Sequence, residues 1–204
     1  MQLYVSPRAP NPRRVLMFLA EKGVQLPLVN VDLNAQEHKS AAFRAKSPLA
    51  RIPALELDDG RVLTETRAIC TFVEGMHPEP NLMGVDATER AFIEMADRRV
   101  EWYFLLPVAN CVRHTHPGLA PLEQPQFPDF GRSQGEKLRE TAAWLDGELQ
   151  RQPWIAGERF TIADITAFCA LEFARLMRFQ ASAEGFAALQ AWRDRMAQRP
   201  SATV

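Results

Sequence analysis

The stretch Arg51-Ile52-Pro53-Ala54-Leu55, followed ten residues later by Glu65-Thr66, indicates how this chain folds. The proline stands at the entry of a β-prone run, where it removes a backbone donor, and X-Pro bonds are the ones that adopt the cis form. A cis bond here leaves the backbone N–H and C=O of Ile52 unpaired and directed outward. We therefore expect an extended, peptide-like ligand to lie against Ile52 as an additional strand.

Glu65 and Thr66 open a predicted helix, after the tight turn Asp58-Asp59-Gly60 and a returning strand. A helix start offers free backbone N–H groups and a partial positive charge, which suit a carboxylate. The acidic side chain of Glu65 suits an amine next to that carboxylate. These features predict a site for a small zwitterionic peptide, although Thr66 is also a residue type that merely caps helices.

The composition sets limits on size and partners. At 204 residues, the chain is long enough for one or two domains with a substantial core. Its 24 basic and 25 acidic residues nearly cancel, which gives no reason to expect nucleic acid or an anionic membrane as a partner. The longest apolar stretch, 102–111, is about half of the ~20 residues needed to span a bilayer. We expect a soluble, cytoplasmic protein.

The three cysteines, Cys70, Cys111 and Cys169, are far apart and form no C-x-x-C pair. Such a set fits a reducing compartment and buried, apolar thiols. If the protein carries out thiol chemistry, the thiol is not its own. We also expect no metal site, because the run 114–116 (His-Thr-His) lacks further ligands.

The first part of the chain, residues 1–78, alternates between strand and helix patterns. The predicted elements are, in order, a strand 3–5, a helix 13–23, a strand 28–31, a helix 37–46, a hairpin 54–64 and a helix 66–76. This order, with a loop proline before the third strand, is typical of a thioredoxin-like domain.

A linker over residues 79–86 separates this part from the remainder, 87–204, which has an all-helical pattern. Prolines break the chain at 78 and 80. The predicted helices are 86–115, bent at Pro107, then 131–150, 161–178 and 184–198. Thr161 and Asp164 form a capping box at the start of the third of these helices, so we assign Asp164 to folding and not to chemistry.

Four segments carry a resemblance to a known family: SPRAPNPRRVLMFLAEKG at 6–23, SPLARIPALEL at 47–57, LTETRAI at 63–69 and WIAGERFTIADI at 154–165. By their order and spacing, the chain resembles the soluble, bacterial-type glutathione transferase superfamily over nearly its whole length. The resemblance implies an α/β thioredoxin-like domain that binds glutathione. It also implies an all-α helical-bundle domain, which carries the acceptor site.

The resemblance also assigns residues to glutathione, namely His38, Arg51, Ile52, Pro53, Glu65 and Thr66. Pro53 corresponds to the cis proline of the family, and the backbone of Ile52 holds the cysteinyl part. Glu65 and Thr66 bind the amine and carboxylate of the γ-glutamyl part. Arg51, with His38 or Lys39, lies near the glycine carboxylate.

The expected chemistry requires only a donor to the glutathione sulfur. A thiol with a pKa near 8.5 is a few per cent ionised at pH 7, and lowering that pKa by ~2 units requires about 2.7 kcal/mol. One hydrogen bond to a charged group supplies ~1.5–3 kcal/mol, and a helix N-terminus ~0.3–1. Tyr4 lies too early, inside the strand, and the serine position of the family falls on Ala9. The remaining candidates are Asn11, Ser6 and backbone N–H groups.

The acceptor site is expected on the long helix 86–115. One stripe, in steps of four, three and four residues, consists of Tyr103, Pro107, Asn110 and His114. We predict that it forms the wall facing the thiol. A more apolar face, which we predict to be core, consists of Phe104, Leu105, Val108 and Val112. Arg8 is placed to attract anionic acceptors.

These features, with the resemblance, imply a transferase that stabilises the glutathione thiolate and conjugates it to small hydrophobic electrophiles, as in detoxification. Glutathione is then a co-substrate, no metal takes part, and the protein is a homodimer packed through its third and fourth helices. Two alternatives stay open. One is glutathione-dependent reduction of peroxides or disulfides, and the other is a non-catalytic glutathione-binding scaffold or regulatory protein.

Overall fold

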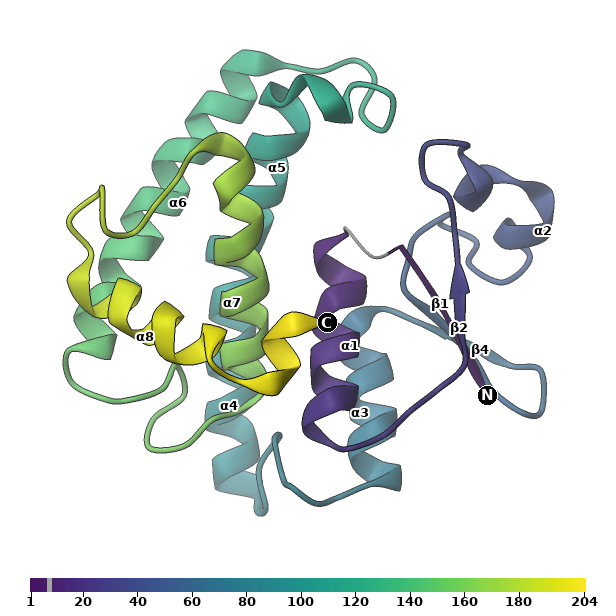
Figure 1. The fold of residues 1–204 in the computed structure, drawn as a ribbon, viewed down its shortest axis with the longest axis horizontal. Coiled ribbons are helices and arrows are strands. Elements are labelled where there is room, and N and C mark those ends of the chain that lie inside the picture. Colours follow the sequence, from purple (N-terminus) through teal and green to yellow (C-terminus); the bar gives the residue numbers. More distant parts are fainter. Residues whose placement is uncertain (7–8) are drawn as a thin grey trace. The chain divides into compact units, whose positions relative to one another are not determined.

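The computed structural model describes residues 1–6 and 9–204, which divide into two compact units, 1–80 and 81–203 (Figure 1). The elements of the first unit are β1 (Gln2–Val5), α1 (Pro10–Glu21), β2 (Leu28–Asn30), a 3-10 turn (Glu37–Lys39), α2 (Ala41–Arg44), β3 (Ala54–Glu56), β4 (Val62–Thr64) and α3 (Thr66–Met76). This is the predicted β-α-β-α-β-β-α order, so the thioredoxin-like assignment is confirmed.

The sheet of this unit has the strand order β2-β1-β3-β4, with β1 parallel to β2 and the other pairs antiparallel. Leu3 pairs with Leu55, and both are fully buried. Helices α1 and α3 lie on one side of the sheet (Figure 1). Because side chains alternate across a strand, Tyr4 points to the opposite face, where it meets Phe43 of α2. The two faces therefore have separate cores.

The predicted helix 37–46 is wrong in its extent. The backbone of Ser40 is extended (φ −62°, ψ 153°), which ends the 3-10 turn, and its hydroxyl accepts the N–H of Phe43 at 3.2 Å. Ser40 is thus the N-cap of the four-residue helix α2, and capping residues favour this role over a helix interior.

The second unit is helical, as predicted. Its elements are α4 (Ala87–Val100), a π-helical segment (Glu101–Leu105), α5 (Leu106–Thr115), a 3-10 turn (Pro117–Leu119), α6 (Pro128–Leu149), α7 (Ile162–Ala174), a 3-10 turn (Arg175–Met177), α8 (Ala187–Ala197) and a final 3-10 turn (Pro200–Thr203). The core centres on α7, whose residues 162–171 are all buried. No helix among the described residues combines the length and apolar character needed to cross a membrane.

The bend predicted at Pro107 takes the form of the π-helical segment just before it. The N–H of Leu106 bonds to the C=O of Glu101, one residue further back than in an α-helix. Pro107 has no N–H to offer to the C=O of Tyr103. That carbonyl instead accepts the hydroxyl of Thr141, on α6, at 2.6 Å. The wider turn and the Thr141 hydroxyl together accommodate the proline.

The capping box at the start of α7 is present as predicted. The fully buried Asp164 carboxylate accepts the backbone N–H groups of Thr161 and Ile155, both at 2.9 Å, and the indole N–H of Trp192 at 3.0 Å. Asp164 therefore ties a loop and α8 to the start of α7, which is more than a cap requires.

A second buried carboxylate, Asp146 of α6, caps another helix from a distance. The start of α8 has no side-chain cap of its own. Asp146 accepts the backbone N–H of Leu189, in the first turn of α8, at 2.9 Å. Two carboxylates therefore satisfy helix N-termini inside this unit.

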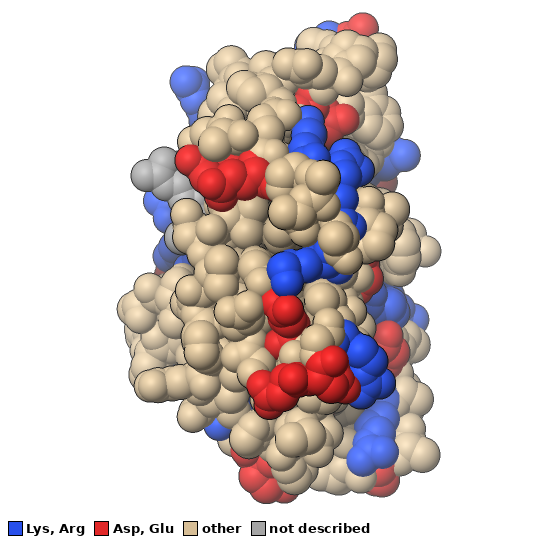
Figure 2. Space-filling view, turned by 90° about the vertical axis from the view of Figure 1, so that its right-hand side faces the viewer, with Lys and Arg blue, Asp and Glu red and all other residues tan. Residues whose placement is uncertain are grey.

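The surface charge shows no large field in the view of Figure 2. Basic and acidic side chains lie there in small mixed groups, and neither sign forms a continuous area. Elsewhere in the structure, charges also pair directly, as Arg61 does with Asp59 in the turn between β3 and β4. On the face in Figure 2, the charges are balanced in space as they are in the sequence.

We predict that Asp164 makes stability depend on pH in a direction opposite to that of a surface carboxylate. Burial raises the pKa of Asp164 to about 6, so between pH 4 and 6 the folded state binds more protons than the unfolded state. Its contribution to the free energy of unfolding therefore falls as the pH rises through this range, by roughly 2–3 kcal/mol. Urea unfolding at pH 4, 5, 6 and 7 measures this change. The free energy of unfolding of the wild type, relative to that of Asp164→Asn, should fall as the pH rises. A constant difference would contradict the prediction, and Asp194→Asn, at an exposed site, is the control.

Candidate functional site

The loop before β3 is fixed by one buried serine. The Ser47 hydroxyl donates to the C=O of Arg51 at 2.8 Å and accepts the N–H of Arg51 at 3.1 Å. The Ile52–Pro53 bond is cis. Among the residues that the structure describes, neither the N–H nor the C=O of Ile52 has a hydrogen-bond partner. Ser47 therefore holds the chain just before a backbone pair that is open to a ligand.

Glu65 occupies the N-cap position of α3, and Thr66 is the first helical residue. The interpretation of Thr66 as only a helix cap is therefore wrong, because the cap position belongs to its neighbour. Glu65 is exposed. Its backbone lies at φ +66°, ψ 120°, a region that residues other than glycine rarely adopt. The first turn of α3 presents backbone N–H groups that have no partner within the helix.

The strand register brings these segments to one end of the sheet. Ala54 of β3 pairs with Tyr4 of β1 on one side and with Thr64 of β4 on the other. The segments that directly adjoin these three residues are the end of β1, the cis-proline loop and the start of α3. Ile52 and Glu65-Thr66, which are 13 residues apart in the sequence, are thus neighbours in space.

The start of α1 differs from the prediction. Asn11 is the second residue of the helix, because the helix begins at Pro10 and Ala9 occupies the N-cap position without a capping side chain. Proline at the first helical position is favoured by its fixed φ and missing N–H, and the helix therefore starts three residues before the predicted residue 13. The Asn11 amide oxygen accepts from Arg14 at 3.2 Å. Because Arg14 only donates, the amide NH₂ of Asn11 faces away from it.

The other predicted residues of this unit have different settings. Ser6 is half-buried and its C=O accepts the N–H of Ala9 at 3.1 Å. His38 is buried in the 3-10 turn, and Arg51 is exposed. Arg8 lies outside the described residues. The structure thus brings Ser6, Ile52 and the Glu65-Thr66 pair toward one end of the sheet.

The predicted acceptor stripe does not form one face. Tyr103 is 64% exposed, whereas Pro107 is buried, because the π-helical segment between them shifts the helical register. Asn110 and His114 remain on one side of α5, four residues apart, and both are half-buried. The predicted core residues of this helix are buried as expected, namely Phe104, Leu105, Val108 and Val112.

The His114 ring has a defined environment. Its Nδ1 accepts the backbone N–H of Phe127 at 3.1 Å, so its Nε2 carries the proton in the neutral form. The ring of Phe130 meets it edge to face at 5.1 Å. Sequence reasoning named His114 but missed these two phenylalanines, because their contacts depend on how α6 packs on α5.

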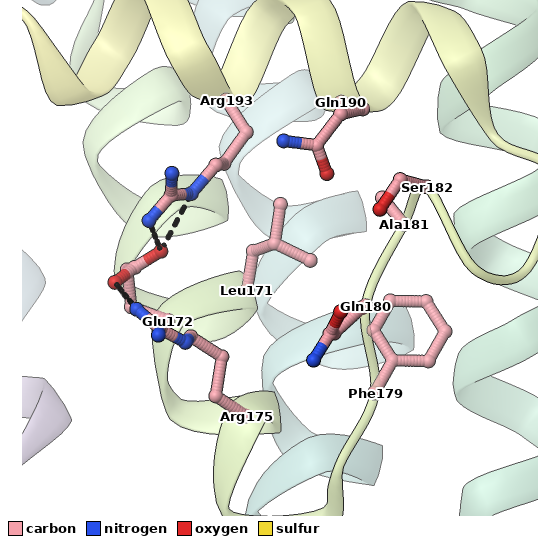
Figure 3. Close-up of a pocket in the computed structure, with 9 residues that line it drawn as sticks. All are labelled: Leu171, Glu172, Arg175, Phe179, Gln180, Ala181, Ser182, Gln190 and Arg193. Carbon is pink, nitrogen blue, oxygen red and sulfur yellow. Dashed lines mark hydrogen bonds and ion pairs between the residues drawn. The ribbon is translucent and has the colours of Figure 1, made fainter.

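A pocket of about 200 Å³ in the second unit lies between the end of α7, the segment 179–182 and α8 (Figure 3). Its charged residues pair with one another: Glu172 accepts from Arg193 at 2.8 Å and from Arg175 at 3.2 Å. Each of these charged side chains already has an ion-pair partner within the pocket, so the pocket is not part of the candidate site. Among residues 1–6 and 9–204, no group of three or more His, Cys, Asp or Glu is arranged to hold a metal ion.

The two units define a class: a thioredoxin-like domain with a cis-proline loop before its third strand, joined to an all-helical domain. Comparison with known proteins narrows this class. The model of the glutathione S-transferase N-terminal domain matches residues 9–76, and that of the C-terminal domain matches residues 131–200. The chain is 37% identical over 204 residues to Glutathione S-transferase 2 of Saccharomyces cerevisiae, with 98% of this chain and 87% of that protein covered.

Solved structures of glutathione S-transferases are also similar to this chain. The crystal structure of Gtt2 from Saccharomyces cerevisiae has a TM-score of 0.94 and 36% identity, covering 100% of this chain and 99% of that one. A glutathione S-transferase domain-containing protein of Marinobacter aquaeolei has a TM-score of 0.90 and 39% identity, covering 98% and 99%. The chain therefore belongs to the glutathione S-transferase superfamily, and the resemblance found in the sequence is confirmed.

We predict that the backbone at Glu65 stores strain. A residue other than glycine at positive φ costs of order 1–3 kcal/mol, and glycine avoids most of this cost. Glu65→Gly should therefore have a free energy of unfolding about 0.5–1 kcal/mol above that of Glu65→Ala, as measured by urea unfolding. The control is Ala68→Gly in the first turn of the same helix, where glycine should lower stability instead. If Glu65→Gly is less stable than Glu65→Ala, the predicted backbone strain is contradicted.

Proposed function

We propose that this protein binds glutathione at the end of the sheet and conjugates its thiol to small hydrophobic electrophiles. One observation carries the proposal: the register through Ala54 gathers an open backbone pair at Ile52, the start of α3 and the end of β1 at one place. Glutathione is a zwitterionic peptide with a thiol, and these three segments offer a complement to each of its parts. Membership in the family supports the assignment.

In this proposal, each part of glutathione has a partner of suitable chemistry. The cysteinyl backbone pairs with the N–H and C=O of Ile52 as a short strand. The γ-glutamyl carboxylate accepts from Thr66 and the first N–H groups of α3, while its amine pairs with Glu65. The glycine carboxylate is assigned to Arg51, which is exposed, and to His38.

The thiolate is assigned to the start of α1. Pro10 and Pro12 have no N–H, so the first three helical residues offer the backbone N–H of Asn11 and its side-chain amide as donors. The Asn11 amide oxygen is occupied by Arg14, which leaves its NH₂ as the group assigned to the thiolate. One such bond, at ~1.5–3 kcal/mol, lowers a thiol pKa by about 1–2 units. No general base is needed for this step.

For the acceptor, we propose the half-buried side of α5 that carries Asn110 and His114. The reductase alternative through a protein thiol has no support in the structure, because Cys70, Cys111 and Cys169 are all buried. Reduction of peroxides by bound glutathione would use the same site. Aryl halides and hydroperoxides as alternative acceptors distinguish the two activities.

The test of the thiolate is an ultraviolet titration of bound glutathione. We expect its thiol pKa to lie about 1–2 units below the free value of about 8.5, and Asn11→Ala to raise it by about 1 unit. Asn11→Asp, which has nearly the same shape but no NH₂, should raise it further because of its charge. A wild-type pKa equal to that of free glutathione would contradict the transferase mechanism and favour a non-catalytic binding protein. A pKa raised by Ser6→Ala, and not by the Asn11 variants, would assign the donor to Ser6.

We further propose that the protein is a cytoplasmic homodimer, with α4 and the start of α5 in the interface. Large apolar side chains are 38–64% exposed along this run, namely Phe92, Met95, Trp102, Tyr103 and Leu106. Their spacing places most of them on one side of the helix. Beside them, a hollow of about 400 Å³ includes Trp144 of α6. A monomer would leave this apolar surface in water.

Sedimentation velocity tests the dimer. We expect the wild type to sediment as a dimer and Phe92→Glu to sediment as a monomer at micromolar concentration, because a buried, unpaired charge opposes association. Phe127→Glu is the matched control, since Phe127 is 57% exposed and Phe92 59%, but Phe127 lies outside the proposed interface. A dimer that persists in Phe92→Glu, or dissociates equally in both variants, would contradict this interface.

A further inference from the structure

A cluster of polar side chains surrounds Glu56, at the end of β3 away from the candidate site. One carboxylate oxygen accepts three hydrogen bonds: from Gln2 at 2.9 Å, from the Tyr4 hydroxyl at 2.6 Å and from the Lys46 ammonium at 2.8 Å. The register explains two of them, because Gln2 pairs directly with Glu56 and Tyr4 lies two residues further on the same face. The hydrogen bonds from Lys46, Tyr4 and Gln2 hold the pKa of Glu56 at about 2, so it is ionised near neutral pH.

Lys46 connects this cluster to the loop that carries Ile52. Its ammonium also lies 5.3 Å from the centre of the Tyr4 ring. Ser47, the next residue, makes both hydrogen bonds to the backbone of Arg51. The chain between α2 and β3 is therefore attached to the sheet at Lys46. The hydrogen bonds from Ser47 to Arg51 then close a short loop, and Ile52 is the next residue.

The segment that precedes Lys46 cannot hold its own position. Helix α2 has four residues, far fewer than the ~12–15 at which an isolated helix becomes even marginally stable. Phe43 anchors it by an apolar contact, with its ring edge-on to Tyr4 at 6.0 Å. Apolar packing restrains position but not direction, whereas the Lys46–Glu56 ion pair adds a directional contact.

We propose that Glu56 is a positioning residue for glutathione, which holds Lys46 and, through Ser47, fixes the backbone of Ile52. This inference rests on the proposed function. Glu56 itself lies four residues along the strand direction from Ile52, about 13 Å at ~3.3 Å per residue, so it acts through the loop and not by contact with the tripeptide. Breaking the ion pair removes no residue that contacts glutathione in the proposal, but it lets the loop that carries Ile52 sample other positions.

The test compares glutathione binding in variants of the ion pair. Lys46→Met keeps the length and apolar stem of the side chain but removes its charge, and Glu56→Gln keeps the size of the acid. We expect the Kd for glutathione, measured by titration calorimetry, to rise 3- to 10-fold in both. At saturating glutathione, kcat and the KM for the electrophile should stay within twofold of the wild type. Lys46→Arg, which keeps the charge, should restore most of the affinity.

The double variant and a control complete the design. Lys46→Met combined with Glu56→Gln should bind about as weakly as either single variant, because both remove one interaction. Asp59→Asn breaks a different ion pair, with Arg61 in the turn beyond β3, and should leave Kd unchanged.

The outcomes separate the two proposals. Wild-type protein that does not bind glutathione would overturn the proposed function. Wild-type protein that binds, with an unchanged Kd in Lys46→Met, would overturn the positioning role alone. Equal loss of kcat and affinity, without rescue by Lys46→Arg, would also overturn it, since that pattern indicates general damage to the fold.

Discussion

The register of three strands, Tyr4 with Ala54 and Ala54 with Thr64, is the constraint on which the candidate site depends. It decides which segments lie at the same end of the sheet, and it also decides which side chains face each core. A slip of one residue would exchange the two faces, so that Glu56 and Leu55 would each turn to the core on the opposite side of the sheet. Because both faces have their own partners, the register is strongly determined, and the position of Ile52 beside Glu65 follows from it.

Prolines act on the structure by removing donors, and the molecule uses that property at several places. At Pro107, the carbonyl that loses its partner is satisfied by Thr141, and the helix widens into a π-helical turn. At Pro10 and Pro12, the loss of two N–H groups leaves Asn11 as the source of donors in the first turn of α1. The missing N–H of proline therefore widens a helix in the second unit. In the first unit, it leaves Asn11 as the residue that carries the donors at the start of α1.

Local signals in the sequence predicted the strand-helix order and the capping box at Asp164, because each depends on residues close together in the chain, whereas the cis bond at Pro53 was implied by the family resemblance. The prediction failed where distant residues decide. Two prolines in three positions made the start of α1 ambiguous, and the stripe through Tyr103 assumed an uninterrupted helix. Ser47 and Glu56 were missed as parts of the site because their importance arises from contacts with a loop and a neighbouring strand. The assigned roles of the site residues remain predictions from the family pattern.

The two units use their polar groups differently. In the second unit, Asp146 and Asp164 satisfy helix starts and loop N–H groups, so their hydrogen-bonding capacity serves the fold. In the first unit, Ile52 keeps its backbone pair open, and Glu65 keeps a strained backbone. Unpaired and strained groups cost free energy, and they persist in folded proteins mainly where a ligand compensates for them. The unpaired groups of Ile52 and the strained backbone of Glu65 lie at one end of the sheet, and Ser47 and the Lys46–Glu56 pair hold the loop beside it. This is the physical reason to place the ligand there.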